Sequence, residues 1–240
     1  MRSIWLAALW MCGPAFALAQ SVPSGTLLPV SLDGSLNAGK AHAGQVIRAT
    51  VMQNVPGAAI RRRTHIYGHV VEAKRSKAGG QTLEIRFDSV EIRGKSVPIQ
   101  TNLRALASFL EVEQAQIPEE MSSRGMTPET WDTQQIGGDQ VFRGGGPVDE
   151  GYKTVGSVTP WGVLGLPLME PGMPCRGAIG DATRPQALWL FSADACGLYG
   201  YPYIHIDHYG RVDPKGTIVL TSANGKLKLG SGSAILLRVS

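Results

Sequence analysis

The chain has 240 residues, of which 43% are hydrophobic and 18% charged, and its formal net charge is +4. This composition excludes a disordered or fibrous chain, and the length allows one large domain or two small ones. The 30 glycines and 15 prolines disfavour long helices, so we expect strands and turns.

Residues 1–19 have the features of a secretory signal peptide. Arg2 gives a positive start, Ile4–Leu18 is apolar, and Ala17-Leu18-Ala19 is an A-x-A cleavage signal. The apolar run is shorter than the ~20 residues that span a bilayer, and no later run is long enough. We therefore expect cleavage after Ala19, loss of Cys12 with the signal, no transmembrane segment in the mature chain, and export to the periplasm, the cell envelope or the medium.

Charge divides the mature chain into three regions. Residues 20–110 hold 12 Lys and Arg against 5 Asp and Glu, 111–159 hold 3 against 9, and 160–240 hold 7 against 5. We interpret 20–110 as an N-terminal β-barrel or sandwich, 111–159 as an acidic flexible insertion, and 160–240 as a C-terminal β region that packs on the first. The acidic middle is either a solvated insertion or a segment that docks on the basic half.

Apolar alternation and β-branched residues predict strands in the first region. We expect them at Leu28–Leu32, Gln45–Gln53 and Ile60–Lys74. Between Leu83 and Ile92 the apolar residues change parity after Phe87, which predicts a bulge near Asp88-Ser89. The segment Thr101–Val112 is ambiguous between a strand and a short helix.

Strands are predicted again after Pro160. They are expected at Ala187–Ser192, Tyr199–Tyr209, Thr217–Thr221, Lys226–Leu229 and Ser233–Val239. The Asn224-Gly225 pair predicts a hairpin between the third and fourth of these strands, and the last strand is expected to return to the first region. Strands and helices do not alternate, so the predicted fold is all-β: a small antiparallel barrel or sandwich with an irregular acidic insertion and a C-terminal β region.

Residues 44–100 carry a resemblance to a known family. Its pattern is a strand at Gln45–Gln53, then His65-Ile66-Tyr67-Gly68-His69-Val70, an apolar strand ending at Phe87-Asp88, and Gly94-Lys95-Ser96-Val97-Pro98-Ile99. This resembles the β-barrel domain of the TrbI-type family, an outer-membrane-associated component of type IV secretion, and implies an envelope β-barrel. Arg61-Arg62-Arg63 stands where the family has Pro-x-Gly, and no amphipathic helical pair is seen, so a secretion channel is not implied. The remaining chain resembles exported bacterial proteins of unassigned function.

Two motifs suggest a binding site for a nucleotide or a nucleic acid, but each lacks a feature that such a site requires. Gly34–Lys40 matches most of a phosphate-binding loop, but Ala41 replaces the Ser or Thr that binds Mg²⁺ and a strand follows in place of a helix. We expect a polar loop there. On a strand only Arg61 and Arg63 of the arginine triplet share a face, so no nucleic-acid partner is predicted.

Histidine spacing argues against a metal site. On a strand, His65 and His69 lie ~13 Å apart at ~3.3 Å per residue, too far to share one ion. In His205-Ile206-Asp207-His208 the two histidines face opposite sides. We therefore predict no metal and no other cofactor.

One strand carries a notable polar and aromatic stripe. Its six same-parity residues are Tyr199, Tyr201, Tyr203, His205, Asp207 and Tyr209. Such a face either binds a glycan, a peptide or an envelope protein, or packs beneath the 111–159 segment. We expect an exported, non-catalytic module that binds a partner or ligand through these residues. The alternative is a secreted hydrolase of glycans or peptides that uses His205 and Asp207.

The mature chain retains two cysteines, Cys175 and Cys196. An oxidising compartment favours their pairing, so we predict a disulfide between them. It would join the glycine-rich segment around Cys175 to the end of the predicted Ala187–Ser192 strand. The rival interpretation, a reactive Cys196, needs an adjacent base that the sequence does not show.

Overall fold

The computed structural model describes residues 21–117, 132–138, 140–142, 144–150, 152–168, 184–206 and 216–240. These residues form strands β1 to β18 and one short helix, α1 (Phe109–Gln114). The fold is all-β, as predicted, and its sheets are open, as in a sandwich. Within the described ranges no helix is long and apolar enough to cross a membrane.

The larger sheet has ten strands, in the order β14-β7-β18-β1-β3-β4-β5-β16-β15, with β6 paired to β5. Neighbours are antiparallel except β14 and β7, which run parallel. The strands are β1 (Leu27–Leu32), β3 (Val46–Val51), β4 (His65–Arg75), β5 (Gln81–Ile92), β6 (Lys95–Pro98), β7 (Thr101–Ala107), β14 (Gly197–Tyr199), β15 (His205–Ile206), β16 (Ile218–Ser222) and β18 (Ala234–Val239).

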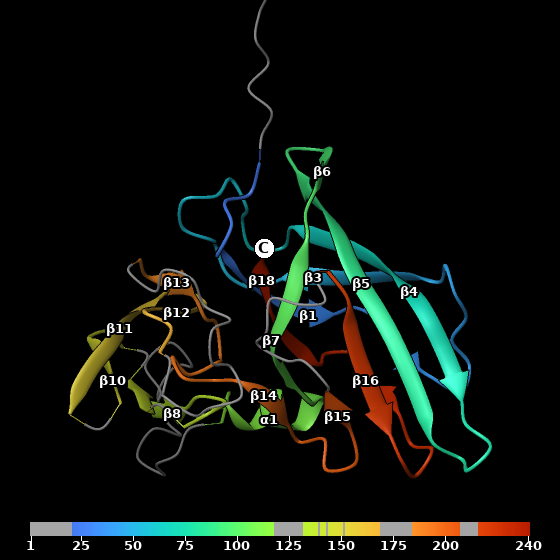
Figure 1. Cartoon of the computed structure of the whole chain (residues 1–240). Coiled ribbons are helices and arrows are strands. Elements are labelled where there is room, and N and C mark those ends of the chain that lie inside the picture. Colours follow the sequence, from blue (N-terminus) through green and yellow to red (C-terminus); the bar gives the residue numbers. More distant parts are fainter. Residues whose placement is uncertain are drawn as a thin grey trace, which may run out of the picture.

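A second sheet of six strands lies beside the first, with α1 near its lower end (Figure 1). Its strands are β13 (Gln186–Ala187), β12 (Gly162–Gly165), β11 (Lys153–Thr159), β10 (Pro147–Glu150), β9 (Gln140–Phe142) and β8 (Asp132–Gln134), in that order. A separate two-stranded sheet joins β2 (Leu36–Asn37) to β17 (Lys228–Leu229).

Strand β1 contributes to both hydrophobic cores because its side chains alternate. Leu28 and Val30 belong to the first core, which one face of the larger sheet encloses, whereas Leu27 belongs to the second. The second core fills the space between the two sheets. It takes Ala105 and Leu236 from the larger sheet. Strand β18 pairs with β1 along Leu27–Ser31, so the end of the chain completes the sheet that the N-terminal region begins.

The bulge predicted in β5 is confirmed. Tyr67 pairs with Ser89 and Gly68 pairs with Phe87, which leaves Asp88 as the extra residue. The insertion restores the parity of the apolar side chains, since Phe87 and Val90 are both fully buried.

The described part of the acidic segment differs from the irregular insertion that we expected. Strands β8 to β11, within 132–159, build most of the second sheet. Val141, Val148 and Val155 are buried in the second core. Isolated valines at strand positions are enough to anchor short strands against a partner sheet, although the segment is poor in large apolar residues.

One predicted strand and one predicted strand pairing near the C-terminal end are wrong. Ala187–Ser192 is buried but is a strand only at its start, because Trp189 has a left-handed backbone (φ 52°). Asn224-Gly225 does form a turn, but β16 pairs with β5 and β15 while β17 pairs with β2. In the observed pairing Leu227 and Leu229 are buried in the first core, which favours this arrangement.

Candidate functional site

The predicted Tyr199–Tyr209 strand is interrupted, so its six side chains do not form one stripe. Strand β14 ends at Tyr199 and β15 begins at His205, with a turn between them. Gly200 has a φ of +70°, and a Cβ there would lie 2.3 Å from the Ser108 hydroxyl, so the chain turns at a position only glycine fills easily. Asp207 and Tyr209 lie outside the described residues.

Tyr199 packs inward and does not line the groove that Tyr201 and Tyr203 share. Its ring packs against the second core, and its hydroxyl oxygen accepts a hydrogen bond from the Cys196 N–H at 3.0 Å. Burial raises the pKa of the Tyr199 phenol above its ordinary value.

Tyr201 and Tyr203 are the two members of the predicted set that come together at one concave surface. The Tyr201 ring packs against the first core, and its hydroxyl lies 2.7 Å from Ser233 Oγ, which fixes the ring. Burial raises the Tyr201 pKa. Tyr203 is 58% exposed. His205 is exposed at the start of β15. Its proposed partner Asp207 lies outside the described residues, so the pair stays a prediction.

We call this concave surface the Tyr–Lys groove. It has a volume of about 350 Å³. Its described lining residues are Asn37, Tyr201, Pro202, Tyr203, Ile204, Gly225, Lys226, Leu227 and Lys228. Tyr201 and Tyr203 were predicted from the sequence as binding residues. Asn37, Lys226 and Lys228 were not, because their segments carry no binding motif.

The second wall of the groove is built by strand alternation. Leu227 and Leu229 point into the first core, so Lys226 and Lys228 face outward and are exposed. Asn37 pairs with Lys228 across the two-stranded sheet, which places their side chains on the same face. The arrangement offers ammonium groups and an amide beside two tyrosine rings.

The loop that resembles a phosphate-binding loop has its amides committed within the chain. The N–H groups of Lys40 and Ala41 donate to the Asn37 carbonyl, the N–H of Gly39 donates to Asn37 Oδ1, and the N–H of Ala38 donates to the Leu227 carbonyl. A phosphate cradle needs such N–H groups to be free. The prediction of a polar loop holds only in part, because Leu36–Asn37 form strand β2, which pairs with β17.

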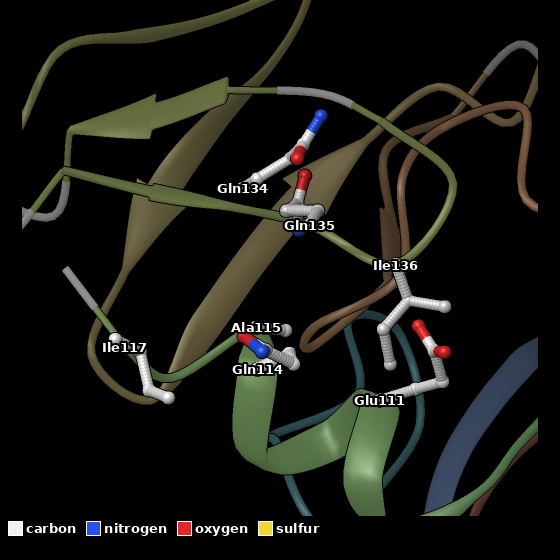
Figure 2. Close-up of a pocket in the computed structure, with 7 residues that line it drawn as sticks. All are labelled: Glu111, Gln114, Ala115, Ile117, Gln134, Gln135 and Ile136. Carbon is white, nitrogen blue, oxygen red and sulfur yellow. The ribbon is translucent and has the colours of Figure 1, made fainter. Parts of the chain in front are cut away.

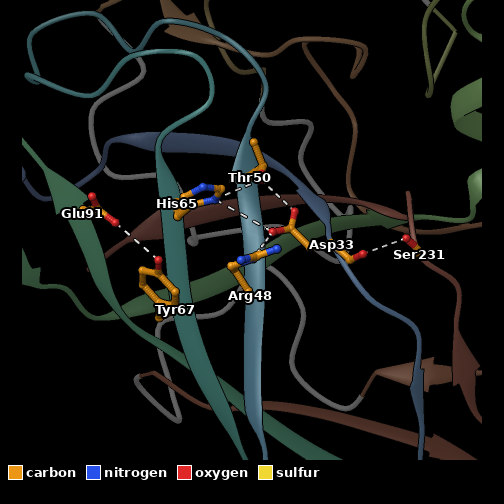
Figure 3. Close-up of polar contacts among 7 residues, drawn as sticks. All are labelled: Asp33, Arg48, Thr50, His65, Tyr67, Glu91 and Ser231. Carbon is orange, nitrogen blue, oxygen red and sulfur yellow. Dashed lines mark hydrogen bonds and ion pairs between the residues drawn. The ribbon is translucent and has the colours of Figure 1, made fainter. Parts of the chain in front are cut away.

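The two β4 histidines each lie beside a different carboxylate. His65 Nδ1 lies 3.2 Å from Thr50 Oγ1 and 3.9 Å from Asp33, and Asp33 also binds Arg48 and Thr50 (Figure 3). His69 Nδ1 lies 2.7 Å from Asp88 Oδ2. No cluster of three or more metal-ligating side chains occurs among the residues that the structure describes.

A second, smaller pocket of about 220 Å³ was not anticipated. Figure 2 shows helix α1 on one side of it and the segment that follows β8 on the other. Its described lining residues are Glu111, Gln114, Ala115, Ile117, Gln134, Gln135 and Ile136. The signal for its helical wall was Ser108, which caps α1 by accepting a hydrogen bond from the Glu111 N–H.

No protein-family model, curated protein or solved structure matches this chain.

Proposed function

We propose that this chain is an exported, non-catalytic module of the cell envelope or the extracellular space, which binds a ligand or partner in the Tyr–Lys groove. The observation that carries the proposal is the groove itself. Its lining combines Tyr201, which is held by Ser233, and the exposed Tyr203 with the exposed residues Lys226 and Lys228. Pockets with apolar aromatic walls and a few oriented polar groups are typical of ligand sites.

Binding is favoured over hydrolysis by the chemistry of the lining. The described lining residues supply no carboxyl group, thiol or imidazole. Hydrolysis of glycosides ordinarily requires a pair of carboxyl groups, and hydrolysis of peptides requires a nucleophile with a base or a metal.

Export is supported by the signal-like features of residues 1–19. The resemblance of 44–100 to an envelope β-barrel agrees with the same compartment. Intact mass of the protein recovered from the periplasm or medium tests this part, with a mature N-terminus at Gln20 expected. A retained N-terminus or cytoplasmic residence contradicts it.

The binding function is tested by NMR titration of the mature protein with neutral and charged oligosaccharides and hexapeptides. We expect at least one probe to shift the amide resonances of residues 201, 203, 204 and 226–228 in a saturable manner. The proposal fails if no probe shifts them, or if all shifts fall elsewhere on the surface.

A further inference from the structure

The Tyr–Lys groove carries uncompensated positive charge. Lys226 and Lys228 are its only charged residues among the described lining. Neither forms an ion pair with any residue that the structure describes. Two cations in a concave surface, without a carboxylate among the described walls, favour an anionic occupant.

The remaining lining suits a ring that has an apolar C–H face and hydroxyl groups at its edge. Tyr203 is 58% exposed beside Pro202, and the buried side chains of Ile204 and Leu227 underlie the groove. Asn37 uses Oδ1 to accept from the Gly39 N–H, which leaves its amide NH₂ to donate outward. A saccharide ring presents an apolar C–H face to an aromatic ring and hydroxyl groups to an amide at its edge.

An extended peptide fits this surface less well. Peptides that bind beside a strand usually pair with its free backbone edge. Here the N–H of Lys226 donates to Asn224 Oδ1 and the N–H of Leu227 donates to Gln81 Oε1. The Leu227 carbonyl accepts from the Ala38 N–H. The backbone beside the groove is therefore already bonded.

We infer that the ligand of the Tyr–Lys groove is an acidic saccharide, whose carboxylates pair with Lys226 and Lys228 and whose ring stacks on Tyr203. This inference rests on the proposed function, because it names the ligand class of the same site. Hydroxyl groups on the ring would then accept from the amide of Asn37.

The test uses three probes that differ in one property at a time. Hexagalacturonic acid is the acidic saccharide, its fully methyl-esterified form is the matched neutral saccharide, and hexaglutamate is an acidic chain without sugar rings. Each is titrated into the mature protein while the amide resonances of residues 201, 203, 204 and 226–228 are followed. We expect hexagalacturonic acid to bind at least tenfold more tightly than either of the other two.

The outcomes distinguish a wrong ligand class from a failure of the proposed binding function. Equal binding of the methyl ester overturns the requirement for charge, and equal binding of hexaglutamate overturns the requirement for a sugar ring. In both cases ligand binding in the groove still stands. If hexagalacturonic acid leaves the groove resonances unchanged, the inference is wrong. If every oligosaccharide and peptide probe does so, the proposed function fails as well.

Variants locate the interaction. Lys226→Gln with Lys228→Gln should weaken hexagalacturonate binding about tenfold and reduce its salt dependence. Tyr203→Ala should weaken it by about the same factor at any salt concentration. Two substitutions elsewhere provide the matched controls, Lys95→Gln and Tyr152→Ala. Both control residues are exposed and lie outside the groove lining, so equal losses in the controls would overturn the assignment to the groove.

Discussion

The backbone N–H of Trp189 donates to Oε1 of Gln53 at 2.7 Å, across 136 residues of sequence. The Gln53 amide also donates to the Val163 carbonyl at 2.9 Å, and Gln135 donates to the Trp189 carbonyl at 3.2 Å. Two glutamines thus bind the backbone N–H and the backbone carbonyl of Trp189. The φ of this residue is 52°, which is unusual for a residue with a large side chain. This explains why the buried ALWLFS segment turns instead of continuing as a strand.

Gln53→Ala should lower the free energy of unfolding by about 1–3 kcal/mol, because it leaves the buried Trp189 N–H without its partner. The Val163 carbonyl loses one hydrogen bond but still accepts from the Leu188 N–H. Urea denaturation measures the effect. Gln100→Ala is the control, since Gln100 is exposed, and should change stability by less than about 0.5 kcal/mol. Similar values for both variants would contradict the assigned role of Gln53.

Gly68→Ala should be strongly destabilising, by more than about 2 kcal/mol. An added Cβ at Gly68 would clash with the backbone carbonyl oxygen of Arg86. It would also lie 2.9 Å from two further backbone atoms, the Arg86 carbonyl carbon and the Phe87 Cα. Because all three are backbone atoms, no side-chain rotation can relieve the clash. At Gly34, by contrast, nothing lies within 4 Å of an added Cβ and φ is not positive. Gly34→Ala should therefore unfold at nearly the same urea concentration as the parent. A tolerated Gly68→Ala would mean that β4 and β5 are spaced differently at the bulge.

Tyr201 should contribute to the loss of stability at alkaline pH. Burial raises its pKa above the ordinary 10.0, and the hydrogen bond with Ser233 only partly opposes this. A phenol with a raised folded-state pKa stabilises the fold fully below pH 10, and that contribution is lost as the pH rises through the folded-state value. Tyr201→Phe should thus be about 1 kcal/mol less stable than the parent at pH 8, with a smaller difference at pH 11.

Urea unfolding of both proteins across this pH range provides the measurement. Tyr199, whose pKa is also raised, and Arg104, whose burial lowers its pKa to about 10, are present in both proteins and do not affect the comparison. A difference that stays constant between pH 8 and pH 11 would show that Tyr201 does not ionise differently on unfolding.

The Cys175–Cys196 disulfide remains a prediction, because Cys175 lies outside the described residues. In an oxidised sample, thiol titration of the unfolded mature protein should find no free thiol. A bond that closes a loop of about 20 residues should add about 3 kcal/mol of stability on the chain-entropy model, so reduction should lower the unfolding midpoint. Two titratable thiols in the unreduced protein would disprove the pairing.

Local pattern was sufficient where a strand has one buried face. Alternation located β4 and β5, and the change of parity after Phe87 located the bulge, because each depends on neighbouring residues only. The partner of a strand is a tertiary property. Asn224-Gly225 marked a turn correctly, but the turn chemistry carried no information on whether the strand after it joins β16 or β2.

Only the tyrosine side of the groove could be predicted from the sequence, because the other side depends on a strand pairing. Tyr201 and Tyr203 are close together and attract notice as aromatic residues. Asn37 and Lys228 reach the same groove only because β2 and β17 pair, and single exposed lysines in a basic chain give no signal. The error at Tyr199–Tyr209 arose at Gly200, since a strand pattern does not reveal that one position needs a positive φ.

The position of β18 has a consequence for how the chain acquires its fold. This strand lies between β1 and β7 in the middle of the larger sheet, yet it follows every other described strand in the sequence. Until Ala234–Val239 has emerged, β1 and β7 each present an unpaired, apolar edge. Folding must then wait for contacts of very long sequence separation, which are slow to form. Nascent chains that lack this strand should be prone to self-association through the two open edges.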